Sequence, residues 1–199
     1  MALGFLVALL TGVLLWFPIT VKAYSAMGGA GAFLLAVVAF IPIFVVMARP
    51  SLLTYMLFSA VTEGYVLAVI PVYAYALGPI AWGIVAGGAA AFALIGLAFS
   101  QEDRSVGEGV GRAAFWMILL SLVGSIALII GGIFGWYSWH LDLLTTGIAF
   151  VGFLLFAAYD ASRVRTYPDE YRAATALLID LVGIIVELLR LVLLLQRRD

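Results

Sequence analysis

The stretch AAFWMILLSLVGSIALIIGGIF, at residues 113–134, contains no charged side chain. An apolar run of about 20 residues is long enough to cross the hydrocarbon core of a bilayer as a helix. Similar runs, separated by charged residues, glycine or proline, fill most of the chain. They lie at residues 2–21, 29–48, 52–77, 80–99, 113–134, 143–159 and 173–195. The sequence therefore predicts an all-α membrane protein, a bundle of seven transmembrane helices forming a single domain over residues 1–199.

The composition of the 199 residues agrees with this architecture and excludes several classes of function. Hydrophobic residues make up 66% and charged residues 11%, against roughly 45–50% and about 25% in soluble domains. A formal net charge of −1 provides no basic surface for nucleic acid. The chain has no cysteine and one histidine, His140, so thiolate chemistry and most zinc or triad enzymes are excluded. We expect neither an enzyme nor a bound cofactor.

The basic residues between the runs predict the orientation in the membrane. The first run is expected to remain as a helix, because residues 1–5 lack the positive charge that opens a signal peptide. A cytoplasmic amino terminus places six arginines in the inner loops and three basic residues outside. The inner set is Arg49, Arg104, Arg112, Arg163, Arg165 and Arg172, and the outer set is Lys22, Arg197 and Arg198. We expect a multi-pass protein of a prokaryotic inner (plasma) membrane. Its carboxyl terminus is outside, unless the last segment dips in and returns.

Few ionisable side chains fall inside the predicted spans. A charge at the bilayer centre costs about 2.5–3.5 kcal/mol on insertion scales, so such a residue usually faces protein or water. These residues are Glu63, Asp160, Asp180, Glu187 and Arg190. Because seven residues return to nearly the same helical face about 10 Å along the axis, Asp180 and Glu187 are expected to share one stripe of the last span.

Asp160 and Asp180 are expected to meet. The two last spans are antiparallel neighbours joined by a short connection, which brings the end of one near the start of the other. Two carboxyl groups in contact do not easily both ionise, so the pair can hold one proton jointly and titrate as a unit. The alternative is that Asp160 caps its helix or binds Arg163 or Arg165.

Glu63, Asp180 and Glu187 are also candidates for an ion path. Calcium binds several oxygens from carboxylates, carbonyls or water, and these three acids can supply some of them along a wet path. Asp180 and Glu187 are the candidate metal ligands. Two alternatives stay open: Glu187 forms a salt bridge with Arg190 three residues later, and Glu63 is a buried, protonated acid.

Three short motifs resemble those of one known family. They are Phe156-Ala157-Ala158-Tyr159-Asp160, then Leu177-Leu178-Ile179-Asp180-Leu181, then Glu187-Leu188-Leu189-Arg190. Together with Glu63-Gly64 in the third span, they resemble the transmembrane Bax inhibitor motif family, also called Bax inhibitor-1. The seven spans fit the whole architecture, although the specific motifs cover only residues 156–190 and the third span. Leu181 stands where the family usually has an aromatic residue.

The resemblance implies a fold and a function. It implies a bundle with the seventh helix surrounded by the other six, and a pH-sensitive leak of calcium across the membrane. It also implies that Asp160 and Asp180 share a proton near the cytosolic side and govern opening. Arg49 is the candidate basic residue that pairs with Asp160 when the path closes.

The leading hypothesis is therefore a pH-sensitive calcium or cation leak channel, or a channel-like carrier, gated by Asp160 and Asp180. The alternative is a non-transporting membrane protein that modulates proteases or regulators of cell death and stress. Intramembrane aspartyl proteolysis is disfavoured, because Ile179 stands where that family has glycine before its second aspartate. The expected partners are the lipid bilayer and calcium or another cation, and a monomer is compatible with this.

Overall fold

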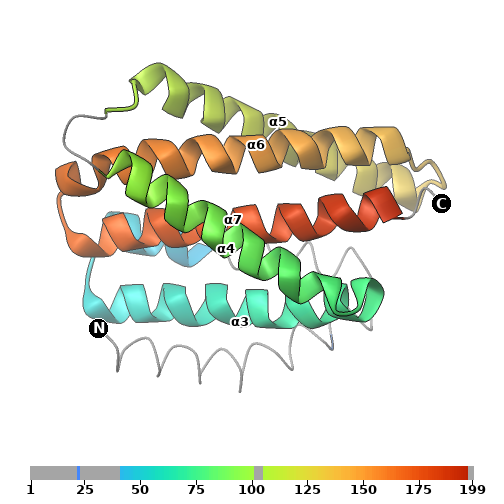
Figure 1. Cartoon of the computed structure of the whole chain (residues 1–199), viewed down its shortest axis with the longest axis horizontal. Coiled ribbons are helices and arrows are strands. Elements are labelled where there is room, and N and C mark those ends of the chain that lie inside the picture. Colours follow the sequence, from blue (N-terminus) through green and yellow to red (C-terminus); the bar gives the residue numbers. More distant parts are fainter. Residues whose placement is uncertain (1–21, 23–40, 101–104, 197–199) are drawn as a thin grey trace. The chain divides into compact units, whose positions relative to one another are not determined.

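The part of the chain that the structure describes is mainly helical. This computed structural model describes residues 22, 41–100 and 105–196, without the side chains of 63–72, 74 and 75. Helices, and no strand, make up these ranges (Figure 1). They are α3 (Leu52–Leu77), α4 (Ile80–Phe99), α5 (Glu108–Ile133), α6 (Trp139–Arg163), the 3₁₀ helix η2 (Val164–Thr166) and α7 (Glu170–Gln196), with a further helical segment at residues 41–48. The all-α prediction is confirmed.

The number of spans stays a prediction. The first predicted span, residues 2–21, and residues 29–40 of the second lie outside the described residues. Helices α3 and α4 begin and end at the predicted residues, and α3 continues without interruption through Glu63 and Pro71. The last three helices correspond to the predicted fifth, sixth and seventh spans.

These last three helices are longer than the predicted apolar runs, because polar residues at their ends extend them. The first turns of α5 and α7 contain Glu108 and Glu170, and a negative charge near a helix N-terminus is favourable. Helix α6 begins four residues early because the Ser138 side chain accepts a hydrogen bond from the backbone N–H of Leu141 and caps it. The apolar run therefore marks the middle of each helix and not its ends.

Packing divides the chain into two compact units. Met1–Val72 and Tyr167–Ala176 belong to the first unit, and Tyr73–Thr166 and Leu177–Asp199 to the second. In the first unit, the Arg172 guanidinium donates two hydrogen bonds, of 3.1 and 2.7 Å, to the backbone carbonyl of Met47. That carbonyl belongs to the last turn of the helical segment at 41–48, where carbonyls lack intrahelical partners. The Tyr55 and Tyr171 rings also lie 6.0 Å apart.

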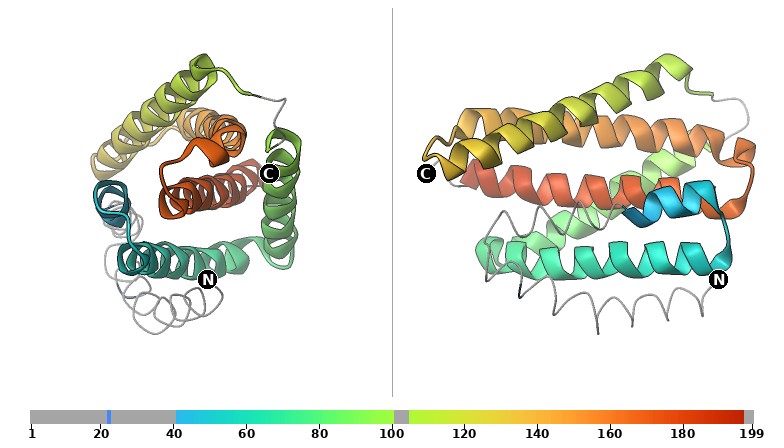
Figure 2. Two further views of the ribbon diagram at one scale, coloured as in Figure 1. Left: turned by 90° about the vertical axis from the view of Figure 1, so that its left-hand side faces the viewer. Right: turned by 180° about the vertical axis from the view of Figure 1, so that it is seen from behind.

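In the second unit, α5 and α6 run antiparallel and side by side, and α7 from Leu177 onward lies along α6 (Figures 1 and 2). Glycines permit the close approach of these helices. A Cβ atom at Gly152 of α6 would lie 2.9 Å from Ile118 of α5, and one at Gly183 of α7 would overlap the ring of Phe153 of α6. Both positions thus need a residue without a side chain.

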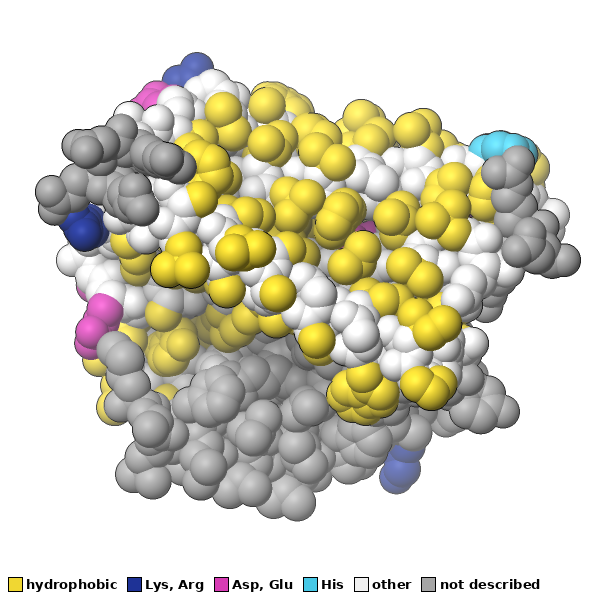
Figure 3. Space-filling view, in the orientation of Figure 1, with side chains coloured by type: hydrophobic (Ala, Val, Ile, Leu, Met, Phe, Trp, Pro, Cys, Tyr) yellow, Lys and Arg dark blue, Asp and Glu magenta, His cyan; other side chains and the backbone are white. Residues whose placement is uncertain are grey.

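The second unit has the surface of a membrane protein. Ile80–Phe99, Glu108–Ile133 and Trp139–Thr166 are long and apolar enough to cross a membrane. Large apolar side chains are exposed along α4 and α5, among them Trp82, Leu94, Leu97, Trp116, Leu120 and Ile133. Apolar side chains cover much of the face in Figure 3, and the charged ones visible there stand mainly at its margins. Which membrane holds the chain, and in which orientation, stays a prediction.

Candidate functional site

The carboxyl groups of Asp160 and Asp180 are in contact inside the second unit. Asp160 lies near the end of α6, and Asp180 lies in the third turn of α7, after the turn formed by η2. Both residues are buried, with 8% and 3% of their surface exposed. A side-chain hydrogen bond joins the two groups. A hydrogen bond between two carboxyl groups needs a hydrogen on one of them, so this arrangement is compatible with one shared proton.

The other oxygen of Asp180 and one oxygen of Glu187 are buried without a hydrogen-bond donor. Within the described part of the chain, no partner is found for Oδ2 of Asp180 or Oε2 of Glu187. Oγ1 of Thr146, on α6, is in the same condition. Buried polar atoms are nearly always hydrogen-bonded, so these oxygens are candidate positions for a proton, a water molecule or a cation. The two acids follow one stripe of α7, seven residues apart.

A second polar cluster lies nearer the end of α7. Arg190 of α7 forms an ion pair with Asp142 in the first turn of α6, with 2.5 Å between Nη2 and Oδ1. The Tyr137 hydroxyl donates to the other oxygen of Asp142 over 2.6 Å. Glu187 interacts electrostatically with both Arg190 and Asp142. The carboxylate of Asp142 is thus held by a cation and a hydroxyl at once.

This cluster corrects the simplest expectation for Arg190. Sequence proximity pointed to Glu187, three residues earlier, as its salt-bridge partner. The ion pair in the structure is instead with Asp142, and Glu187 lies close enough to interact electrostatically with Arg190. Asp142 was not among the predicted site residues. One pattern in the sequence could have indicated it: eighteen residues, about five helical turns, separate Asp142 from Asp160, so both acids share one face of α6.

Arg163, one of the two alternative partners of Asp160, binds other residues in the structure. Arg163 forms an ion pair with Glu108 of α5 at 3.2 Å, and its guanidinium lies 4.6 Å from the centre of the Tyr159 ring. The Arg163 guanidinium is therefore bound by Glu108 and by the Tyr159 ring. Asp160 interacts with Asp180, and its pairing with Arg165 stays a prediction.

The remaining predicted site residues fall elsewhere. Arg49 belongs to the first unit, where it is exposed after the helical segment at 41–48. Its pairing with Asp160, a residue of the second unit, stays a prediction. Glu63 lies within α3, and its side chain is outside the described residues.

The described residues do not gather the ligands of a resident calcium ion. Among them, no three acidic or histidine side chains converge on one point. Asp180 and Glu187, the predicted calcium ligands, are about 10 Å apart along their helix. Their arrangement suits a succession of weak oxygen sites better than one closed site, because calcium in a closed site takes six to eight oxygens.

Comparison with known proteins gives no relative from which a function for this site can be inferred. No protein-family model matches the chain, and no curated protein is similar to it.

Proposed function

We propose that this chain conducts calcium or another cation across a membrane, through a path whose opening depends on the proton shared by Asp160 and Asp180. The proposal includes the finer expectations from the sequence: seven spans, a cytoplasmic amino terminus, a prokaryotic inner membrane, and membership of the Bax inhibitor-1 family. The observation that carries it is the buried contact between two carboxyl groups on adjacent helices.

The contact can couple protonation to helix packing. With one proton, the two carboxyl groups form a hydrogen bond that holds α6 against α7. Without it, two negative charges face each other in a region poor in water, and their repulsion has to be relieved. The helices can separate, or a cation can enter between the oxygens. Arg49 is proposed as the cation that pairs with Asp160 in one of the two states.

The oxygens along α7 provide the path itself. A cation that leaves Asp180 meets the buried Oε2 of Glu187 next on the same stripe. Conduction requires sites that bind an ion weakly enough to release it, which isolated carboxyl groups achieve more readily than a complete coordination shell. Arg190 and Asp142 follow, as a paired charge at the far end of this row.

Calcium flux into vesicles that contain only the purified chain tests the proposal. Flux is recorded with a trapped calcium indicator over a series of pH values around neutrality. We expect a pH-dependent flux in the wild type and a curve flat with pH for Asp180→Asn, because an amide cannot exchange the shared proton. The repulsion model fits an increase or a decrease of flux with pH, since charge alone does not set the direction of opening.

The matched control is Glu170→Gln, which removes an exposed carboxylate from the first turn of the same helix. It should leave the pH curve unchanged. A wild-type protein without flux would overturn the proposal and favour a non-transporting interaction protein. Flux with the same pH curve in wild type and Asp180→Asn would retain conduction and refute the proton-sharing gate.

A further inference from the structure

A groove on the second unit lies apart from the aspartate pair. It has a volume of about 490 Å³ and is lined by the first turns of α5 and the last turns of α6. The lining residues are Glu108, Gly111, Arg112, Phe115, Trp116, Phe156 and Tyr159. This volume is in the range of sites for small organic molecules.

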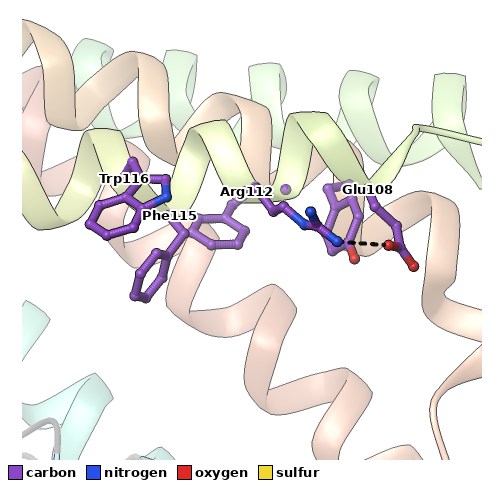
Figure 4. Close-up of a pocket in the computed structure, with 7 residues that line it drawn as sticks. Glu108, Arg112, Phe115 and Trp116 are labelled. Carbon is purple, nitrogen blue, oxygen red and sulfur yellow. Dashed lines mark hydrogen bonds and ion pairs between the residues drawn. The ribbon is translucent and has the colours of Figure 1, made fainter.

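The groove has a charged end and an aromatic end. Figure 4 shows Glu108 and Arg112 joined at one end, and the rings of Phe115 and Trp116 farther along the same helix. The Arg112 and Glu108 side chains are 3.5 Å apart and largely exposed, at 79% and 64%. The Phe115 and Trp116 side chains are also mostly exposed, and their rings pack edge to face. Polarity therefore changes from charged to apolar along one helix.

The charged end carries a net positive charge. Glu108 forms ion pairs with both Arg112 and Arg163, so two guanidinium groups share one carboxylate. Arg112 remains mostly exposed in its pair and has donors left for a further acceptor. Guanidinium groups bind phosphate oxygens in a two-pronged geometry.

We propose that this groove binds one anionic phospholipid, with its phosphate at Arg112 and an acyl chain along Phe115 and Trp116. Both helices that form it are long and apolar enough to cross a membrane, so their charged ends lie at the headgroup level. Basic pockets between transmembrane helices are typical sites for anionic headgroups, and tryptophan favours the region just below. The proposal depends on the membrane location of α5 and α6 and is independent of cation transport.

Gly111 keeps the groove open at the level of the tyrosine. A Cβ atom at this position would lie 2.8 Å from the Tyr159 ring, so any side chain there would displace that ring. The Arg163 guanidinium lies over the Tyr159 ring, 4.6 Å from its centre. The ring is thus fixed as a wall of the groove between α5 and α6.

Native mass spectrometry of the full chain tests the proposal directly. The protein is released from micelles that contain equal amounts of phosphatidylglycerol and phosphatidylcholine with matched acyl chains. We expect one retained lipid, with a preference for phosphatidylglycerol of roughly fivefold, the effect of one net basic charge near an anionic headgroup. Arg112→Gln should reduce the preference to about one. The control Arg165→Gln removes an exposed arginine of η2 that does not line the groove, and should retain it.

A second measurement locates the acyl chain. Phosphatidylglycerol with brominated chains should quench the fluorescence contributed by Trp116, taken as the difference between wild type and Trp116→Phe. The control is Trp82→Phe, at an exposed position of α4 outside the groove. Equal retention of both lipids by the wild type, equal effects of the two arginine variants, displacement of the lipid by inorganic phosphate, or a bound second copy of the chain would each overturn the proposal.

Discussion

The Asp160 side chain could be assigned a partner from the sequence because the relevant geometry is local. Asp160 ends one helix and Asp180 begins the buried part of the next, and a short connection forces these helices to be antiparallel neighbours. Helical periodicity then limits which residues of the second helix face the first. The contact between the two carboxyl groups follows from these constraints. What protonation of the pair does to transport stays a prediction, since no contact within one conformation determines it.

The partner of Arg190 could not be predicted in the same way. Pairing across forty-eight positions depends on the axial offset between α6 and α7, which a pattern of apolar residues does not specify. Nearness in sequence favoured Glu187 because it is the only local acid within reach. Asp142 prevails because it lies at the start of α6, where antiparallel packing brings the last turns of α7 alongside it.

Arg190→Gln tests the importance of this ion pair for stability. The change leaves the carboxylates of Asp142 and Glu187 inside the protein without their cation, and only 12% of the Asp142 side chain is exposed. Loss of one partner from a buried pair typically costs about 3–5 kcal/mol. We expect Arg190→Gln to lower the free energy of unfolding, measured in detergent mixtures, by about 3 kcal/mol. This is the lower end of the range, because 28% of the Arg190 side chain is exposed to solvent.

Asp142→Asn supplies the control for this measurement. If the two residues stabilise the protein mainly through each other, the double variant should lose clearly less stability than the sum of the single variants. Additive losses would show that the ion pair is not the source of the effect.

Among the helices, the sequence indicates which residues form each one but not how closely neighbouring helices approach. The bounds of α3 and α4 agree with the apolar runs because turns flank those runs directly. In α5, α6 and α7, capping residues and end charges extend the helix beyond the run. Gly183 and Gly147 are indistinguishable as glycines in apolar helices, yet only Gly183 faces a ring across the interface.

Gly183→Ala and Gly147→Ala form a matched pair of variants that test the packing of α7 on α6. A methyl group at Gly183 would overlap the Phe153 ring near its attachment point, so the helices must move apart. Overpacking of this kind costs about 1–3 kcal/mol. At Gly147 a Cβ atom meets nothing within 4 Å, and the higher helix propensity of alanine is expected to raise stability by up to about 1 kcal/mol. Thermal unfolding of both variants measures the difference; equal midpoints would contradict the assigned interface.

For the molecule as a whole, the main expectation concerns its orientation in the membrane. The predicted bias of loop arginines toward one side depends on the total of all connections and on no single contact. Packing inside the protein does not determine it, because the same helices pack identically whichever way the chain enters the bilayer.

Single cysteines at the two ends of α5 measure the orientation, and the absence of native cysteine makes them specific probes. Ser105→Cys precedes the helix and Phe134→Cys follows it, and both positions are exposed. In intact cells, a membrane-impermeant maleimide should label the Phe134→Cys variant. It should label the Ser105→Cys variant only after lysis. The reverse pattern would invert the predicted orientation, and labelling of both positions in intact cells would contradict a membrane-spanning α5.

Different kinds of interaction hold the two ends of the buried part of α7 against α6. Toward its carboxyl end, the Trp139 indole donates a 2.9 Å hydrogen bond to the Leu194 carbonyl, and Arg190 binds Asp142 in the same first turn of α6. Toward the other end, α7 meets α6 through the Asp160 and Asp180 hydrogen bond, which one ionisation removes. In the proposed mechanism, loss of the shared proton would weaken the packing of α7 on α6 at the aspartates and leave the contacts near Trp139 in place.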